Sequence, residues 1–335
     1  VAEHFYRYEQ MGVKAKSKAR RLLPWSLFLI TSCIFFLVFL GPELINRPTD
    51  FASNIDRLYI PTQVESPNSL FPDDPLPIEI RKSVTDPPFL LAVNRKRGFM
   101  ADGFAILGFY AKSESRLFYH ILREKCRSGG DPPLVVDVGV NFGYFFHFAA
   151  AMGCRVIGVE ANPGLIPYIM TSMGVNNHFG GRMQFYSNAA SDVPGELSFF
   201  QEQDWGNSAV RTEFKSDKTV KTIKIDDIVD EPVELMKVDT EGFEMSVLRS
   251  AERLISSGKV ENFVMEFKHD EQKKQEKLSW LTRMADSGYE IISYEEDYFS
   301  GDLKSYNLTL INFEPWQPNN WPKWEDIWIR RSSTV

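Results

Sequence analysis

Six titratable side chains stand at the ends of short apolar runs, where strands would carry them to one edge of a sheet. They are Asp137, Glu160, Asp239, Glu241, Glu266 and His269. A carboxylate or an imidazole at such an edge can take a proton from a hydroxyl group held within hydrogen-bond reach. We therefore take Asp239, Glu241 and His269 as candidate catalytic residues and Glu266 as a candidate substrate contact.

Two of these assignments have alternatives. Histidine is the side chain that titrates nearest to neutral pH, but the charged stretch at residues 268–271 is equally typical of a solvent-exposed histidine. Asp239, Glu241 and Glu266 also offer hard oxygen ligands of the kind that divalent cations prefer. Their spacing does not require a metal, so we expect none.

A glycine turn follows the first apolar run. Residues 134–136 are short, rich in valine and preceded by two prolines, which predicts a buried strand rather than a helix. Gly139 and Gly143 then allow the backbone to turn and approach a ligand, and the residues from Tyr144 onward favour a helix. The N-terminus of that helix would present unpaired N–H groups to an acidic or polar ligand.

Neighbouring residues indicate which class of ligand the turn would bind. A dinucleotide-binding turn has a second glycine, which admits the pyrophosphate, at the position where this chain has Asn141. Glu160 lies roughly 20 residues beyond Gly139, the offset at which an acid accepts hydrogen bonds from ribose hydroxyls. Asp137 suits an ammonium group better than a phosphate. S-adenosylmethionine, which has a ribose and an ammonium group but no phosphate, fits this pattern.

Apolar periodicity predicts the elements that position these residues. The expected strands are residues 89–93, 134–136, 155–160, 183–186, 233–239, 261–267, 290–294 and 307–313, with edge strands at 196–201 and 220–225. The expected helices are residues 115–126, 163–173, 243–255 and 278–288, and one that starts at Tyr144. This alternation indicates a doubly wound, mostly parallel α/β sheet, and the last two strands, with no helix between them, indicate one antiparallel strand.

Four segments, taken together, resemble the FkbM-type methyltransferase family, a branch of the S-adenosylmethionine-dependent O-methyltransferases. They read Val-Val-Asp-Val-Gly-Val-Asn-Phe-Gly at 135–143, Val-Glu-Ala-Asn-Pro at 159–163, Asn-Ala-Ala-Ser-Asp at 188–192 and Lys-Val-Asp-Thr-Glu-Gly-Phe-Glu at 237–244. The resemblance implies a seven-stranded, Rossmann-like sheet with one antiparallel strand, and methyl transfer to a hydroxyl. Val140 departs from the family, which more often has alanine at this position.

The resemblance also implies roles for individual residues. The expected cofactor-binding residues are Asp137, Gly139, Asn141 and Gly143 at the methionine part, Glu160 at the ribose, Asn188, Ala189 and Ala190 near the adenine, and Asn162. Asp239 would lie beside the reactive end of the cofactor. Apart from the resemblance, we expect Asn207, Ser208 and Glu266 to be substrate contacts.

The N-terminal region predicts a membrane anchor. Residues 22–41 carry no charge and just reach the roughly 20 apolar residues that a bilayer-spanning helix needs. Basic residues at 14–21 predict a cytoplasmic N-terminus. A cleavable signal peptide is the alternative, but the run is long for one and lacks a small-residue cleavage site. We expect a single-pass (type II) protein of the Golgi or another endomembrane, with its catalytic domain in the lumen.

Composition divides the rest of the chain. We expect a basic tail (1–21), the transmembrane anchor (22–41), a proline-rich stem (42–88), an N-terminal cap (89–132), the methyltransferase domain (133–313) and a tryptophan-rich tail (314–335). We expect the tryptophans of the tail to cover the sheet rather than to stack on a ligand.

Three further features bear on partners and compartment. The net charge of −7 argues against a general nucleic-acid surface. Cys126 and Cys154 are able to pair, but we expect free core thiols. The triplet Asn307-Leu308-Thr309 matches a glycosylation sequon, which we expect to be unoccupied because it falls in a predicted strand. The sequence does not indicate an oligomeric state.

The leading hypothesis is a membrane-anchored O-methyltransferase that uses S-adenosylmethionine and acts on a hydroxyl of a glycan or a small molecule. Two other hypotheses stay open. One is a binding or scaffold protein with a degenerate methyltransferase fold, and the other is an enzyme that uses a nucleotide sugar or NAD.

Overall fold

In the computed structural model, all the described residues belong to the unit that runs from Tyr59 to Val335. Within it, the described residues are 78–94, 99–200, 209–210, 219–297 and 302–332. The predicted anchor at 22–41, most of the stem, and the substrate candidates Asn207 and Ser208 lie outside these residues. None of the described helices is long and apolar enough to cross a membrane.

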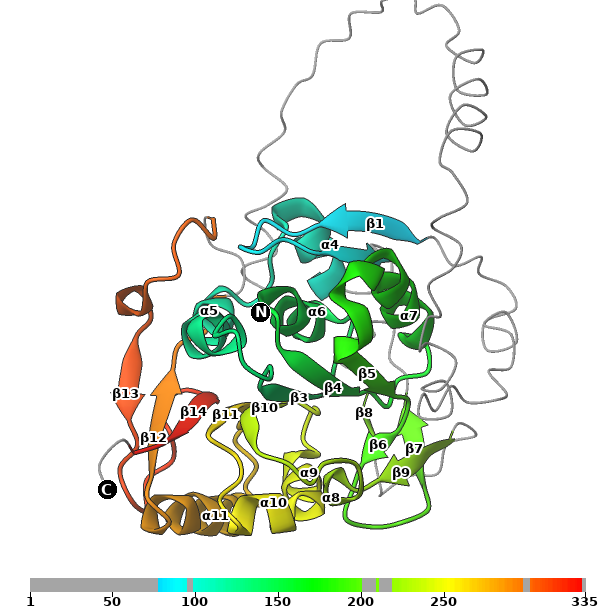
Figure 1. Ribbon diagram of the computed structural model, residues 1–335. Helices are drawn as coiled ribbons and strands as arrows, with labels where there is room; N and C mark the ends of the chain where they lie inside the picture. The colour runs from blue at the N-terminus through cyan, green and yellow to red at the C-terminus, as the bar shows by residue number, and fades with distance from the viewer. Residues whose placement is uncertain (1–77, 95–98, 201–208, 211–218, 298–301, 333–335) are drawn as a thin grey trace, which may run out of the picture. The chain divides into compact units, whose positions relative to one another are not determined.

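An eight-stranded sheet forms the centre of this unit (Figure 1). Its strands, in spatial order, are β13 (Phe313–Pro315), β12 (Tyr289–Tyr294), β14 (Asp326–Arg331), β11 (Asn262–Glu266), β10 (Val233–Val238), β3 (Leu134–Val138), β4 (Arg155–Val159) and β5 (Met183–Tyr186). The five strands from β11 to β5 are parallel, β14 runs antiparallel between β11 and β12, and β13 is antiparallel to β12. The prediction of a largely parallel α/β sheet is therefore confirmed.

The C-terminal end of the sheet differs from the prediction of seven strands with one antiparallel. The sheet has an eighth strand, β13, and two of its strands run antiparallel. Residues 307–313 do not form the expected strand, because Leu308–Leu310 is a 3-10 turn, η5, in which the Asn307 side chain accepts a hydrogen bond from the Thr309 N–H (3.0 Å). Such local side-chain bonds compete with strand pairing.

The tryptophan-rich tail both covers the core, against which Trp316 and Trp321 pack as expected, and enters the sheet. It supplies β14, in which Ile327, Trp328 and Ile329 are all buried, as expected for a central strand that is covered on both faces. The indole N–H of Trp328 donates to the Asn262 side chain (3.1 Å). The sheet consequently extends to Arg331, past the boundary that we expected at residue 313.

Helices pack on both faces of the sheet. Figure 1 shows α5 (Lys112–Cys126), α6 (Tyr144–Met152) and α7 (Ile166–Val175) on one side, and α9 (Glu244–Ser250), α10 (Glu252–Ser256) and α11 (Lys274–Asp286) on the other. Side chains alternate along each strand, so Val135 and Leu235 belong to the core under α5 and α6, whereas Val136 and Met236 belong to the opposite core. We call the first side the α5–α6 face.

Smaller elements complete the described part of the unit. The remaining elements are β1 (Glu79–Lys82), β2 (Leu90–Val93), α4 (Phe99–Leu107), the 3-10 segment η3 (Asn177–Arg182) and α8 (Ile225–Ile228), and a small sheet in the order β6 (Ala189–Ala190), β9 (Thr219–Ile223), β7 (Glu196–Phe200), β8 (Ala209–Val210). The predicted helix at 243–255 is divided into α9 and α10. Helix α7 starts three residues later than predicted, because the Asn162 side chain accepts from Gly164 N–H (2.9 Å) in a preceding turn.

A disulfide joins Cys126 and Cys154, so the expectation of free thiols is wrong. Cys126 is the last residue of α5, and Cys154 directly precedes β4. Gly153 brings the two segments together, since a Cβ at this position would lie 2.9 Å from the Cys126 carbonyl oxygen. The two Cα atoms are 4.9 Å apart, a usual separation for a disulfide.

Candidate active site

The glycine turn after β3 joins the ends of two neighbouring strands. Gly139 has a φ of 87°, and a Cβ on it would overlap the carbonyl oxygen of Asp239 at the end of β10. Its N–H donates to the carbonyl of Val159 in β4 (2.9 Å). Only glycine allows both this backbone conformation and this close approach.

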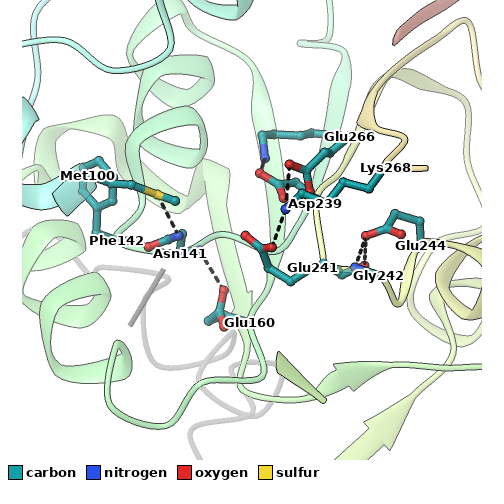
Figure 2. Close-up of polar contacts among 12 residues, drawn as sticks. Met100, Asn141, Phe142, Glu160, Asp239, Glu241, Gly242, Glu244, Glu266 and Lys268 are labelled. Atoms are coloured by element: carbon teal, nitrogen blue, oxygen red, sulfur yellow. Dashed lines mark hydrogen bonds and ion pairs between the residues drawn. The ribbon is translucent and has the colours of Figure 1, made fainter. Parts of the chain in front are cut away.

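Glu160 fixes the far side of this turn. Asn141 has a φ of 54°, and its N–H donates to one Glu160 carboxylate oxygen (2.7 Å), while Asn162 N–H donates to the other (2.7 Å). Figure 2 shows Glu160 pointing toward Asn141, whose amide in turn contacts the Met100 sulfur (3.4 Å). Burial raises the pKa of Glu160, and the two amide N–H groups oppose this rise. Each oxygen still has lone pairs for a second donor, such as a ribose hydroxyl.

Asp137 is buried beside the same turn. It follows Val135 by two positions, so it lies on the α5–α6 face, where Lys237 of β10 is its register partner. Its side chain is 1% exposed, and neither carboxylate oxygen has a hydrogen-bond partner among the described residues. Burial raises its pKa to about 7, against the opposing effect of Lys237. An orphaned buried carboxyl of this kind fits a ligand that brings an ammonium group.

A set of carboxylates lies at the ends of the next strands on the same face. We call Glu114, Asp239, Glu241, Glu266, Glu296 and Asp326 the acidic cluster. Asp239 and Glu241 follow β10, Glu266 ends β11, and Asp326, its register partner, begins β14. Glu114 comes from the first turn of α5, where the Glu296 carboxylate accepts hydrogen bonds from Ser113 and Glu114 N–H groups (both 2.8 Å).

Two lysines balance part of this negative charge. Lys237, which is 4% exposed, donates to Asp239 (3.0 Å) and lies over the Phe145 ring, 5.4 Å from its centroid. Lys268 donates to Glu241 (2.7 Å) and pairs with Glu266 (3.0 Å), as Figure 2 shows. Burial alone would lower the pKa of Lys237, but Asp239 and the nearby Glu114 hold it above its ordinary value. Both ammonium groups therefore stay charged at neutral pH.

Several carboxyl groups of the acidic cluster hold their protons unusually strongly. Burial raises the pKa of Glu266 to about 9, and the charges of Asp239 and Glu241 add to the rise. Burial likewise raises the pKa of Glu296 to about 8 and that of Asp326 to about 7. Perturbed carboxyl groups that gather at strand ends are typical of sites that exchange protons with a substrate.

Three members of the acidic cluster also have the spacing of cation ligands. One oxygen each of Asp239, Glu241 and Glu266 lies within 4.8 Å of the others. The Lys268 ammonium already pairs with two of these three carboxylates. The absence of a metal stays a prediction.

The structure brings some predicted site residues together and leaves others apart. Asp239, Glu241 and Glu266 form one group, whereas His269 pairs with Glu271 (3.1 Å) and packs its ring against Trp321. No hydrogen bond or ion pair between described residues joins His269 to the acidic cluster.

The segment 188–190 belongs to the small sheet. The Asn188 amide donates to the Lys221 carbonyl (3.2 Å), and Ala189 and Ala190 are buried in β6. Their role beside a cofactor stays a prediction, as does that of Gly143, whose carbonyl contacts the His147 ring nitrogen (2.7 Å).

Sequence reasoning missed five residues of this site. They are Glu114, Lys237, Lys268, Glu296 and Asp326. Lys237 carries a usable signal, because a lysine inside an otherwise buried strand requires a partner. Glu114, Glu296 and Asp326 carry no such signal. They lie in α5, after β12 and at the start of β14, and these segments come together only in the folded protein.

Comparison with known proteins identifies the domain. Residues 137–291 match the family model of the methyltransferase FkbM domain, so this part of the chain is an FkbM methyltransferase domain, as its motifs predicted. The chain is also similar to a solved methyltransferase FkbM from Methylobacillus flagellatus KT, at 16% identity and a TM-score of 0.40, over 64% of this chain and 50% of that chain. The chain thus spans half the length of that protein.

Other solved structures are similar at lower identity. An rRNA methylase from Streptococcus thermophilus matches with 10% identity and a TM-score of 0.36, over 64% of this chain and 95% of that chain. Magnesium protoporphyrin IX methyltransferase from Synechocystis PCC 6803, solved with bound SAM, matches with 11% identity and a TM-score of 0.34, over 70% of this chain and 84% of that chain. No curated protein sequence matches the chain.

Proposed function

We propose that the FkbM methyltransferase domain transfers a methyl group from S-adenosylmethionine to a hydroxyl group. One observation carries this proposal: a single edge of the sheet holds two different arrangements side by side. The ends of β3 and β4 carry an orphaned carboxyl and a glycine turn, and the ends of β10, β11 and β14 carry the acidic cluster. Open α/β sheets bind their ligands at this edge.

The first arrangement suits the cofactor. Asp137 would pair with its ammonium group, and Glu160 would accept hydrogen bonds from its ribose. When bound, S-adenosylmethionine supplies an electrophilic methyl group on a sulfonium centre. The acidic surroundings also favour a ligand with positive charge.

The acidic cluster suits the acceptor. Lys237 holds one oxygen of Asp239 and leaves the other for an acceptor hydroxyl, whereas Lys268 pairs with Glu241 and Glu266. A carboxylate positioned like this takes the hydroxyl proton as the oxygen forms its new bond to carbon. Because an anionic acceptor would bring a further negative charge next to Asp239 and the carboxyl groups around it, the acidic cluster favours neutral hydroxyl compounds, such as glycans, over anionic acceptors.

The cellular placement forms part of the proposal. The uncharged stretch at residues 22–41 supports a single membrane anchor with the catalytic domain in the lumen of the Golgi or another endomembrane. The Cys126–Cys154 disulfide supports an oxidising compartment, since such bonds are rare in the cytosol. Glycans are hydroxyl-rich compounds of this lumen, and nucleic acids are not expected there.

The experiment is an assay of the full chain with S-adenosylmethionine and a panel of neutral and acidic glycans. We expect a glycan product heavier by one methyl group, detected by mass spectrometry, together with S-adenosylhomocysteine. Asp239→Asn should lower the rate about 100-fold, because it removes a base in reach of the acceptor. The matched control is Asp286→Asn, which changes an exposed residue at the end of α11.

Two results would contradict the proposal. A folded chain that makes no methylated product from any hydroxyl compound, and gives no heat with S-adenosylmethionine, would favour a binding or scaffold protein. Equal rates for Asp239→Asn and Asp286→Asn would remove the acidic cluster from the reaction.

A further inference from the structure

The only Asn-X-Ser/Thr triplet of the sequence is Asn307-Leu308-Thr309. Its expected place in a strand is wrong, because Leu308–Leu310 forms the turn η5. Asn307 and Thr309 are both exposed, and Leu310 is 56% exposed. The reason that we gave for an unoccupied sequon therefore no longer holds, and we propose that Asn307 carries an N-linked glycan.

The fold holds the triplet outward by anchoring the chain on both sides of it. Leu303 before the triplet and Ile311 after it are each 6% exposed and belong to the core of the α5–α6 face. Tyr306 stacks on Tyr119 of α5 with ring centroids 3.8 Å apart. With its flanks fixed in this way, the turn presents Asn307 to solvent, where a bulky glycan displaces no packed side chain.

The backbone next to Tyr306 is held as well. The Arg116 side chain of α5 donates to the Ser305 carbonyl (2.9 Å), and the Tyr306 hydroxyl accepts from Asp86 N–H (3.0 Å). These contacts come from segments far apart in the sequence, so the exposure of Asn307 is a property of the fold and not of a frayed end.

The local hydrogen bonding leaves the reacting group available. The side-chain oxygen of Asn307, Oδ1, accepts from Thr309 N–H (3.0 Å), and no hydrogen bond between described residues uses the other side-chain atom, Nδ2. Glycosylation forms a bond between Nδ2 and the anomeric carbon of a polyprenyl-diphosphate-linked oligosaccharide. The bond from that carbon to the phosphate oxygen breaks, Nδ2 gives up one proton, and the polyprenyl diphosphate leaves.

The modification requires the lumenal placement proposed above, where the oligosaccharide donor is used. The Cys126–Cys154 disulfide supports that placement independently of the N-terminal segment. The inference does not depend on the methyl acceptor or on catalysis, so it stands or fails separately from the proposed reaction.

The test is to express the full chain in cells with an N-glycosylating secretory pathway and to treat it with peptide-N-glycosidase in ¹⁸O water. We expect one discrete gain in gel mobility, and a tryptic peptide in which Asn307 has become ¹⁸O-labelled aspartate. Asn307→Gln and Thr309→Ala should abolish the shift. Thr309→Ser, which keeps the sequon, should retain it.

The redox state of Cys126 and Cys154 distinguishes two ways in which the glycosylation proposal can fail. If the chain is insensitive to the glycosidase while Cys126 and Cys154 resist alkylation, it has reached an oxidising lumen and Asn307 is not glycosylated. If it is insensitive and both cysteines are alkylated, the lumenal placement is wrong too. Either result overturns the proposal.

Discussion

The two halves of the candidate site are held by different kinds of interaction. At the ends of β3 and β4, backbone N–H groups and a glycine fix the geometry: Glu160 accepts from two amides, and Gly139 lies against the Asp239 carbonyl. At the ends of β10 and β11, side-chain ion pairs fix it, with Lys237 and Lys268 as the cations. Backbone conformation therefore sets the geometry of the first half, and the charges of side chains set the geometry of the second half.

This difference separates the expected effects of substitution. In the first half, an added carbon atom lowers the free energy of unfolding at any pH, because it collides with the main chain. In the second half, loss of a lysine charge lowers the free energy of unfolding by an amount that depends on pH. At low pH, neighbouring carboxyl groups are neutralised by protons and no longer need the lost cation.

Replacement of the buried lysine should cost the most stability. Lys237→Met leaves Asp239, Glu114 and Asp137 without the cation between them, so the free energy of unfolding at pH 8 should fall by about 4 kcal/mol. The loss should be smaller at pH 5, because burial raises the pKa of Glu114 and that of Asp137, so these two carboxyl groups are neutral there. Urea denaturation at both pH values measures this.

A lysine on the surface provides the control. Lys304 pairs with Asp302 in an ion pair whose side chains are 84% and 53% exposed, so Lys304→Met should leave the unfolding midpoint unchanged. If Lys237→Met were equally mild at pH 8, the acidic cluster would not depend on its buried cation.

Substitution of the glycine in the turn comes next. Gly139→Ala adds a Cβ at a φ of 87° where the Asp239 carbonyl already lies, so the free energy of unfolding should fall by about 3 kcal/mol at pH 5 and pH 8 alike. Gly129→Ala is the matched control. Gly129 has a φ of 73° but no atom within 4 Å of its added Cβ, so it should show only the conformational cost of about 1 kcal/mol.

Equal losses for the two glycine variants would show that contact with Asp239 adds nothing. The first half of the site would then be held by local conformation alone. A loss at Gly139 that disappears at pH 5 would instead mean that this turn also depends on charge.

The sequence predicted the first half of the site because its residues are close together in the chain. Asp137, Gly139, Asn141 and Glu160 fall within two consecutive strand–turn units, and the structure places Asn141 on Glu160. Hydrophobic periodicity was sufficient for β3, β4, β10 and β11, whose buried runs are flanked by breakers or carboxylates.

The second half could not be predicted in full, because the fold assembles it. Glu114 comes from α5, Glu296 from the chain after β12, and Asp326 from a strand that the sequence analysis assigned to an outer tail. The insertion of β14 between β11 and β12 brings Asp326 to Glu266. That insertion depends on strand pairing between distant segments, which no local pattern specifies.

The raised carboxyl pKa values predict a decline of stability with rising pH. The pKa is about 7 for Asp137 and Asp326, about 8 for Glu296 and about 9 for Glu266, all above the value of roughly 4 for an unfolded carboxyl group. Between these limits the folded state binds more protons than the unfolded state. The stability that these four groups contribute is therefore complete below about pH 4 and is lost as the pH rises through their folded pKa values of 7 to 9.

Glu266→Gln should flatten the last part of this decline, between pH 8 and 9, because it removes the group with the highest carboxyl pKa. Thermal unfolding of both proteins across this range measures the difference in slope. Parallel curves would show that Glu266 does not hold its proton in the folded state.

The most direct test of the division between the two halves is titration calorimetry with S-adenosylmethionine on the folded chain, Glu160→Gln and Glu266→Gln. The wild-type chain should bind the cofactor, Glu160→Gln should bind it at least about tenfold more weakly, and Glu266→Gln should bind it like the wild type. No heat with the folded wild-type chain would contradict the cofactor assignment. An equal loss in both variants would contradict the separate tasks of the two halves.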